Sequence, residues 1–228
     1  MNIVHKLNDV HVNPGDHRLP SAPRTRRKED ARARILEEAR RIVLENGFEA
    51  LTMRRIAEAA GYSAAALYLH FENRDAIARE LGESGMQGLL AALTEAAAAE
   101  DPVERLRALA LAYVGFARIE PETYRLIFME PGFAASALGG KDEAGAAAFQ
   151  LLAGAFEALG NAGRLRPGQD LGGLALTFWI LLHGTVSLKL TCSAFLSPPE
   201  EDLLATALDS LLNGILAPEP TGLNLPER

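Results

Sequence analysis

The residues whose types and spacing could do chemistry lie near the amino-terminal end, in the stretch 51–70, LTMRRIAEAAGYSAAALYLH. This stretch has the pattern of two short helices separated by a tight turn at Gly61, where glycine can adopt the positive φ that the turn requires. The second helix begins with Ser63, Ala64 and Ala65, whose small side chains can approach base edges in the major groove of DNA. Because many helical proteins contain such hairpins, the pattern alone is a weak indication of DNA binding.

A run of cations, Arg24-Thr25-Arg26-Arg27-Lys28, precedes this stretch. Its four positive charges lie just before a helix predicted to begin at Glu29, where they could bind a phosphate backbone. A disordered, solubilising arm is an equally good interpretation. Residues 24–80 hold twelve Lys or Arg and ten Asp or Glu, whereas residues 81–228 hold nine and eighteen. The net charge of −7 for the whole chain therefore does not exclude a nucleic-acid-binding amino-terminal part.

Other kinds of chemistry find little support in the residues. Cys192 is the only cysteine, which excludes a disulfide framework and a cysteine-only metal site. His5, His11 and His17 recur at six-residue intervals, but no carboxylate cluster accompanies them, so we expect no metal site. The motifs of nucleophile elbows, P-loops, dinucleotide-binding loops and zinc proteases do not occur. We therefore predict no catalytic residues and no cofactor, with an enzyme and a helical adaptor that binds no DNA as the two alternative interpretations.

Helices must position these residues, because apolar side chains recur with helical spacing along the chain. Ile35, Leu36, Ala39, Ile42 and Val43, for example, form a single apolar stripe. The sequence predicts an all-α fold of about nine helices, and no segment indicates a strand. The helices are predicted to begin near Glu29, Thr52, Ser63, Asn73, Asp101, Pro121, Asp142, Asp170 and Pro199.

The most apolar predicted helix allows two interpretations. Residues 171–188 contain no Asp, Glu, Lys or Arg, which meets the length threshold for a membrane span. Glycine and polar residues dilute this run, and an apolar helix can instead be buried between neighbours or at a subunit contact. The final helix, predicted to follow a capping box over residues 197–200, has two parallel apolar rows, more than one core-facing stripe requires. We therefore predict a homodimer through the last two helices and no membrane partner.

The motif becomes specific when its residues are taken together. Thr52, Ile56-Ala57, Ala60-Gly61-Tyr62-Ser63, Leu67-Tyr68-Leu69-His70-Phe71 and Asn73-Arg74-Asp75 closely resemble the DNA-binding domain of the TetR family of bacterial repressors. The resemblance covers about residues 29–80. Ala65 stands where many members have glycine and Arg74 where most have lysine; alanine favours a helix and arginine keeps the positive charge. Trp179 followed by His183-Gly184 resembles the tryptophan-histidine-glycine signature of one C-terminal subgroup of the family.

The resemblance implies an organisation for the whole chain. We expect a DNA-binding domain over 24–80 with its helix-turn-helix at 51–70, a ligand-sensing and dimerisation domain over 81–218, and a tail over 219–228. Residues 1–23 contain three prolines and lack apolar periodicity, so their composition predicts a disordered tail. The implied function is that of a cytoplasmic transcriptional regulator, a repressor that a small-molecule effector releases from DNA. The implied partners are pseudo-palindromic double-stranded operator DNA, the effector and a second copy of the chain.

The family also guides the roles of individual residues. Ser63 and the methyl groups of 64–66 would touch bases, with thymine methyls as the natural partners of alanine. The remaining predicted DNA-binding side chains would bind phosphates. Thr52 would also cap its helix, and Arg74 would lie at a helix amino terminus, where the helix dipole favours an anion. Without the resemblance, Tyr68 would be interpreted as a core residue and the two arginines as a solvated face. The predicted DNA-binding residues are Thr52, Arg54, Arg55, Ser63, Ala64, Ala65, Ala66, Tyr68, His70 and Arg74.

Aromatic residues between the helix-turn-helix and the last two helices could line an effector pocket, since such pockets have apolar walls with few polar groups. Core filling is the equally simple alternative for each of them. The histidine among them could orient a ligand or satisfy a backbone carbonyl. The candidates are Tyr113, Phe116, Phe128, Phe149, Phe156, Phe178, Trp179 and His183.

Three glycines in the long predicted helix after Asn73 suggest how the two parts are coupled. Gly82, Gly85 and Gly88 each cost about 0.5–1 kcal/mol relative to alanine within a helix. One hypothesis is a hinge between the DNA-binding and sensing domains, in which case alanine at all three positions would stabilise the protein. The other is close helix packing on a glycine face.

Overall fold

The computed structural model describes residues 23–130, 143–196 and 199–218, and these residues form nine α-helices, one 3-10 helix and no β-strand. The prediction of an all-α fold is confirmed. The three histidines of the amino-terminal stretch and the predicted cap residue Ser197 lie outside the described residues. The elements are α1 (Pro23–Asn46), η1 (Phe48–Ala50), α2 (Met53–Ala60), α3 (Ala64–Tyr68), α4 (Arg74–Ala96), α5 (Pro102–Ile119), α6 (Pro121–Phe128), α8 (Glu143–Asn161), α9 (Leu171–Cys192) and α10 (Glu200–Ile215).

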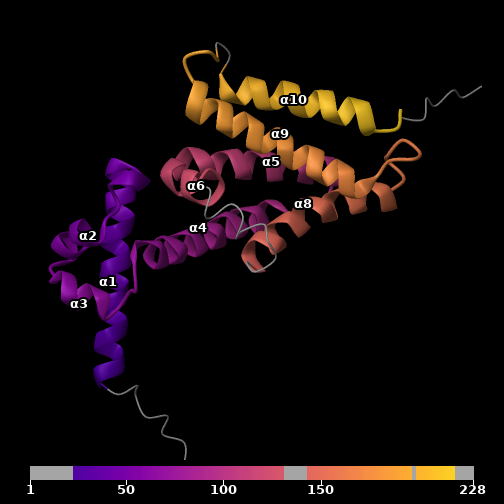
Figure 1. Cartoon of the computed structure of the whole chain (residues 1–228). Coiled ribbons are helices and arrows are strands. Elements are labelled where there is room, and N and C mark those ends of the chain that lie inside the picture. The colour runs from indigo at the N-terminus through magenta and orange to yellow at the C-terminus, as the bar shows by residue number, and fades with distance from the viewer. Residues whose placement is uncertain (1–22, 131–142, 197–198, 219–228) are drawn as a thin grey trace, which may run out of the picture.

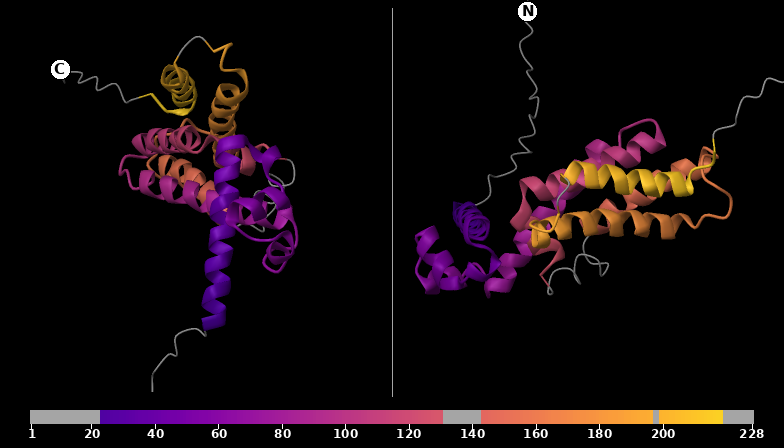
Figure 2. Two further views of the ribbon diagram at one scale, coloured as in Figure 1. Left: turned by 90° about the vertical axis from the view of Figure 1, so that its left-hand side faces the viewer. Right: turned by 90° about the horizontal axis from the view of Figure 1, so that it is seen from above.

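The helices form two lobes that α4 connects (Figures 1 and 2). We call the lobe of α1, η1, α2, α3 and the start of α4 the head, and the lobe of the remaining helices the body. Each lobe has its own apolar core: along α4 the side chains up to Leu81 belong to the head core, and those from Met86 onward belong to the body core. The sequence motif therefore lies in a lobe of its own.

The head elements begin where their capping residues predict. Thr52 accepts a hydrogen bond from the backbone N–H of Arg55 at 3.2 Å, and Ser63 accepts one from Ala66 at 3.1 Å. Asn73 caps α4 in the same way, with 2.8 Å to the N–H of residue 76. Gly61 ends α2 with φ at 74°, as predicted for the turn. These side chains satisfy N–H groups that each helix end leaves free.

Two predicted boundaries in the head are wrong. α1 begins at Pro23 and not at Glu29, so the run of cations lies within the helix and not in an arm before it. Proline is favoured at the first helical position, and the arginines, lysine and alanines that follow are good helix formers. α3 ends at Tyr68, two residues before the predicted end at His70.

The short helix α6 belongs to both lobes. Its Leu126 is 2% exposed and lies in the head core, although the helix follows α5 of the body. Tyr124 and Ile127, on another face, lie in the body core with 0% and 2% exposure. Residues three apart share a helix face, whereas a residue two away from the first points elsewhere. α6 therefore ties the head to the body by apolar packing.

Close packing of α4 against α6 gives a reason for one of the three glycines. A Cβ atom on Gly85 would overlap Cγ2 of Thr123 and lie 3.0 Å from Cδ1 of Ile127. A Cβ atom on Gly88 would meet only Cε2 of Phe116, at an ordinary 3.5 Å. The expectation that alanine stabilises all three positions is therefore wrong at Gly85, where the second hypothesis, close packing, applies.

Gly85→Ala is expected to lower the free energy of unfolding by about 1–3 kcal/mol, because the added methyl group forces α4 and α6 apart. Gly88→Ala is the matched control, and it should raise that free energy by about 0.5–1 kcal/mol through helix propensity alone. Urea unfolding of the two variants beside the wild type measures both effects. A Gly85→Ala protein as stable as the wild type would show that α6 has room to move.

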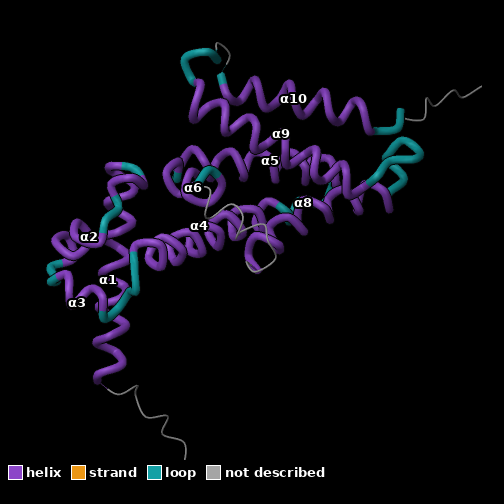
Figure 3. The backbone as a smooth tube through the Cα atoms, in the orientation of Figure 1, coloured by secondary structure: helices purple, strands orange, loops and turns teal. Residues whose placement is uncertain are grey.

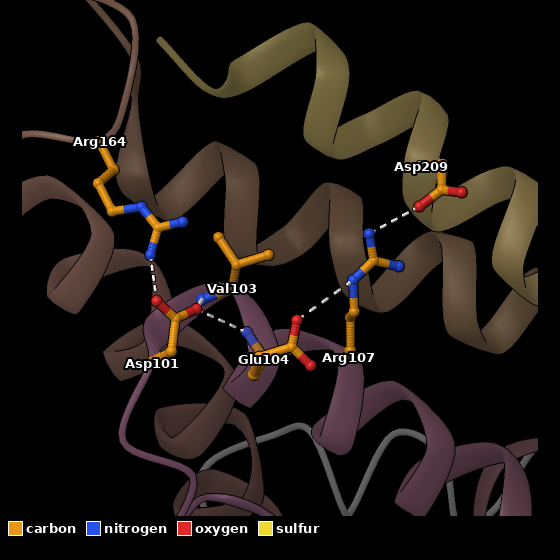
Figure 4. Close-up of polar contacts among 6 residues, drawn as sticks. All are labelled: Asp101, Val103, Glu104, Arg107, Arg164 and Asp209. Atoms are coloured by element: carbon orange, nitrogen blue, oxygen red, sulfur yellow. Dashed lines mark hydrogen bonds and ion pairs between the residues drawn. The ribbon is translucent and has the colours of Figure 1, made fainter. Parts of the chain in front are cut away.

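Ion pairs hold the start of α5 against the rest of the body (Figure 4). The carboxylate of Asp101 caps α5 by accepting from the N–H groups of Val103 and Glu104 at 2.9 and 3.0 Å, and it also binds Arg164. The backbone N–H of Glu104 is the main cause that holds the pKa of this carboxyl below its usual range. One turn later, Nη2 of Arg107 lies 2.8 Å from Oδ1 of Asp209 on α10.

α9 and α10 lie side by side along one edge of the body (Figure 3). Among the described helices, α9 is the one that is long and apolar enough to cross a membrane, judged by length and composition. Phe178 and Leu182 on one face are fully buried, whereas Leu176, Ile180 and Leu188 on another are 46–60% exposed. α10 begins at Glu200 directly after Pro199, and the cap residue of the predicted capping box, Ser197, lies outside the described residues.

Candidate functional site

The exposed face of α3 carries the predicted base-contacting residues. Leu67 is fully buried and fixes α3 to the head core. Ser63, Ala64 and Ala65 are exposed and Ala66 is half-buried, so the small side chains form the outer surface at the start of α3. Ser63 uses an oxygen lone pair to cap α3, which leaves its hydroxyl hydrogen free to donate.

Tyr68 also points outward, which decides against the interpretation of this residue as part of the core. It is 55% exposed at the end of α3, and the next residue, Leu69, is 77% exposed. Leu69, which directly follows α3, was not among the candidates predicted from the sequence. The two side chains extend the small-residue surface with a hydroxyl donor and an apolar group.

The predicted phosphate-binding arginines differ in how they are held. Arg54 is freely solvated, with its side chain 88% exposed and Glu58 at 3.5 Å. Arg55 donates to Oδ1 of Asn46, the last residue of α1, and so joins α2 to α1. Arg74 lies 4.9 Å from the ring centroid of Phe48, so the ring orients its guanidinium at the start of α4. Arg54 has the most freedom to reach a ligand.

His70 is more confined than a surface donor would be. Its Nδ1 is buried and has no hydrogen-bond partner among the described residues, and its ring lies 6.1 Å from that of Tyr62. The backbone around it is fixed, because Nη1 of Arg32 donates to the carbonyl oxygen of His70 at 2.6 Å. The ring orientation is therefore set by the head core.

Half of the predicted ligand-binding residues line a small apolar pocket in the body. Tyr113, Phe128, Phe149 and Trp179 line it, and its free volume of about 30 Å³ is enough for little more than a water molecule. The lining contains no charged side chain. Sequence reasoning missed the other lining residues, which are the aliphatic or small residues Met86, Leu89, Leu93, Gly145, Ala148 and Leu152.

The remaining aromatic candidates do not line this pocket. Phe156 and Phe178 are fully buried and pack edge to face at 5.6 Å between α8 and α9, which is the core-filling alternative. Phe116 lines a different cleft, of about 290 Å³, between head and body. At its rim Nη2 of Arg40 on α1 lies 2.6 Å from Oε1 of Glu120. The helix faces on which these rings lie turn them away from the pocket.

A chain of hydrogen bonds runs behind the pocket and reaches His183. The indole N–H of Trp179 donates to the hydroxyl of Tyr113 at 3.2 Å, and that hydroxyl lies 3.0 Å from the hydroxyl of Tyr124 on α6. The hydroxyl of Tyr124 lies 2.7 Å from Nδ1 of His183, whose Nε2 lies 3.2 Å from Oγ of Ser187. His183 thus stands in a shared network rather than in the pocket lining.

Burial keeps this network uncharged. It raises the pKa of Tyr113 to about 12, against the opposing hydrogen bonds from Tyr124 and Trp179. It likewise raises the pKa of Tyr124 and lowers the pKa of His183. All of these groups are therefore neutral near pH 7, so the wall behind the pocket carries no charge.

Two family models match the chain, and together they cover more than half of it. Residues 35–81 match the model described as bacterial regulatory proteins, tetR family, and residues 106–211 match the one described as tetracyclin repressor-like, C-terminal domain. The chain belongs to the TetR family. The resemblance of residues 29–80 to the DNA-binding domain of this family is confirmed, and the TetR-type helix-turn-helix lies in the head. TetR family members are transcription regulators, not enzymes.

Solved structures show the same TetR fold along most of the chain. A protein of unknown function from a Rhodococcus species is 31% identical, with a TM-score of 0.70 over 82% of this chain and 96% of that one. The regulatory protein SCO4313 is 28% identical, with a TM-score of 0.65 over 84% and 100%. The TetR family regulator PfmR from Thermus thermophilus is 22% identical, with a TM-score of 0.60 over 79% and 97%. No curated protein matches the chain in sequence.

The histidine of the TetR body predicts a pH dependence of stability. Because the pKa of His183 is lowered in the folded state, the unfolded chain takes up its proton first as the pH falls below about 6.5. Stability is therefore lost as the pH falls from about 6.5 toward the folded-state pKa. Urea unfolding at pH 7.5 and pH 5.5 should show a smaller loss for His183→Gln than for the wild type; equal losses would contradict the assignment.

Proposed function

We propose that this TetR family member is a repressor that a small-molecule effector releases from operator DNA. The observation that carries the proposal is α6, whose Tyr124 joins the hydrogen-bond network behind the pocket while Leu126 packs in the head core. A change at the pocket wall therefore reaches the DNA-binding lobe through one rigid turn of helix. The resemblance to the tryptophan-histidine-glycine subgroup, carried by Trp179 and His183-Gly184, is part of the same proposal.

The head binds the major groove through α3. Ser63, Ala64 and Ala65 touch base edges, and with few hydrogen-bonding groups on this surface, specificity depends on thymine methyls and DNA shape. The exposed hydroxyl of Tyr68 donates to a phosphate, and Leu69 beside it adds an apolar contact. The remaining phosphate contacts come from Thr52, Arg54, Arg55, His70 and Arg74, in the places described above.

The exposed apolar row on α9 supports a homodimer through α9 and α10. Leu176, Ile180 and Leu188 lie on one i, i+4 row of the helix, in which Gly184 occupies the position between the last two. On α10, the row of Leu203 and Leu211 is half-buried beside a fully buried row. Pairing the two helices with those of a second copy gives a four-helix interface, and it removes this apolar surface from water in a cytoplasmic protein.

A DNA-binding titration against salt tests the proposal and separates it from its rivals. We expect a dimer to bind a pseudo-palindrome with half-sites about one helical turn apart, taken from the DNA beside its own gene. Fluorescence anisotropy should show the affinity falling steeply as salt rises, because phosphate contacts release counterions. A helical adaptor or an enzyme would show no sequence-specific complex at any salt concentration, and a footprint without two-fold symmetry would contradict the dimer.

A further inference from the structure

The small apolar pocket of the body contains no charged side chain. Its walls are aliphatic and aromatic, and the polar atoms nearest to it, the hydroxyl of Tyr113 and the indole N–H of Trp179, already bind each other. The groups behind them, on Tyr124 and His183, are neutral as well. A charged ligand entering this site would lose its hydration without gaining a counterion, which is costly in an apolar interior.

We propose, on the basis of the function proposed above, that the effector is an uncharged, largely apolar molecule whose one polar group is a hydroxyl that binds Tyr113. The apolar part of the molecule lies against Leu89, Leu152 and Phe149. The hydroxyl lies where the Trp179–Tyr113 bond closes the inner end of the pocket.

The hydrogen bonds that join Tyr113, Tyr124 and His183 can run in either direction, and a hydroxyl on the ligand is compatible with both directions. If Tyr124 donates to Nδ1 of His183, then Tyr113 donates to Tyr124 and offers a ligand only an oxygen lone pair. If Nδ1 of His183 carries the proton, the donors reverse along the chain and Tyr113 offers its O–H. Because a hydroxyl can donate or accept, it completes either arrangement, whereas an ether, ketone or hydrocarbon completes one or neither.

The pocket has to widen before it can hold the ligand, and three of its lining side chains are flexible or exposed enough to move. Free space of about 30 Å³ does not hold a drug-sized molecule. Met86 has an unbranched, flexible side chain, and Phe149 and Trp179 are only half-buried. When Trp179 is displaced, its indole N–H no longer donates to the hydroxyl of Tyr113, and the hydroxyl of the ligand binds there instead. The Tyr113–Tyr124 bond then carries the change to α6.

The single tryptophan of the chain, Trp179, lies in the pocket and reports binding directly. The probes are 1-octanol, octanoate and octylammonium, which share one alkyl chain and differ in the charge of the head group. Quenching or a shift of tryptophan fluorescence, measured at pH 7 with the full chain, gives each dissociation constant. We expect 1-octanol to bind at least about 100-fold more tightly than either ion. Octanoate or octylammonium binding as tightly as the alcohol would overturn the inference.

Tyr113→Phe tests the role of the hydroxyl separately from that of charge. The variant should bind 1-octanol about 5- to 10-fold more weakly, since one hydrogen bond is lost, while the affinity for octane, which can neither donate nor accept, stays unchanged. Tyr62→Phe, which loses a hydroxyl in the head, is the matched control and should bind both probes as the wild type does. Equal weakening of alcohol and hydrocarbon by Tyr113→Phe would mean that the ring, not its hydroxyl, matters.

Failure of the proposed ligand class can be distinguished from failure of the proposed release of DNA by an effector. If 1-octanol shifts the fluorescence of Trp179 but leaves the complex with operator DNA unchanged, the ligand class is right and the release mechanism is wrong. If the operator complex responds to an ion that leaves Trp179 unaffected, the protein is a ligand-responsive regulator with its effector elsewhere, and the inference fails.

Discussion

Tyr68→Phe is expected to weaken operator binding by about 10-fold or more, because each subunit loses one hydrogen bond to a charged phosphate, worth about 1.5–3 kcal/mol. Tyr68 is 55% exposed and makes no described hydrogen bond within the head, so the thermal stability of the variant should equal that of the wild type. Anisotropy titrations at one fixed salt concentration measure the loss. A folded, dimeric Tyr68→Phe or Tyr68→Ala protein that binds as tightly as its parent would remove the basis of the DNA-binding assignment.

The salt dependence distinguishes Tyr68 from the cations beside it. Tyrosine is neutral, so Tyr68→Phe should lower the affinity at every salt concentration without changing the slope of log K against log salt. Arg74→Gln removes a cation and should reduce that slope by about 0.9 for each subunit. Arg107→Gln, which removes a cation in the body, is the matched control for charge and should leave the slope unchanged. A change of slope in the control would show that net charge, not contact, governs binding.

Leu126→Ala is expected to lower the free energy of unfolding by about 2–5 kcal/mol, because it leaves a cavity where α6 enters the head core. The neighbouring Ile127→Ala is the matched control, since it removes a similarly buried aliphatic group from the body core. The two variants should lose comparable stability in different lobes. Calorimetry of Leu126→Ala should resolve an early head transition from a later body transition, which together form one transition in the wild type.

Amide hydrogen exchange locates the loss. In Leu126→Ala the amides of α1, α2 and α3 should exchange faster while those of α8 and α9 keep their protection, and Ile127→Ala should show the reverse. This pattern follows from the two cores on either side of α6. Equal loss of protection in both lobes of both variants would mean that the protein unfolds as one unit and that α6 is not the specific link between head and body.

The helix-turn-helix could be predicted in detail because local chemistry determines it. Thr52, Ser63 and Asn73 cap their helices with side-chain bonds to N–H groups three residues away, and Gly61 adopts the φ that its turn requires. Such interactions depend on neighbours in sequence, which can be read directly. α1 begins six residues before its predicted start because the arginines and lysine of residues 24–28 are good helix formers as well as charged.

The pocket was predicted only in part, because a periodic pattern shows that a residue is buried but not what it is buried against. Tyr113 and Trp179 meet at the pocket, whereas Phe156 and Phe178, equally aromatic and on the same helices as other candidates, fill the core between α8 and α9. No pattern in the sequence distinguishes the two pairs. The crossing of the helices decides which faces meet, and that depends on the packing of all of them together.

By itself the sequence determined the all-α fold and the helix-turn-helix motif, since periodicity, caps and turns are local properties. Only the tertiary structure decided that Leu126 of α6 packs in the head while Tyr124 joins the network of Tyr113 and His183. Residues 59 positions apart form that last bond, at 2.7 Å. Such contacts exist only when the helices have packed, because burial gives two distant side chains a common, water-free environment.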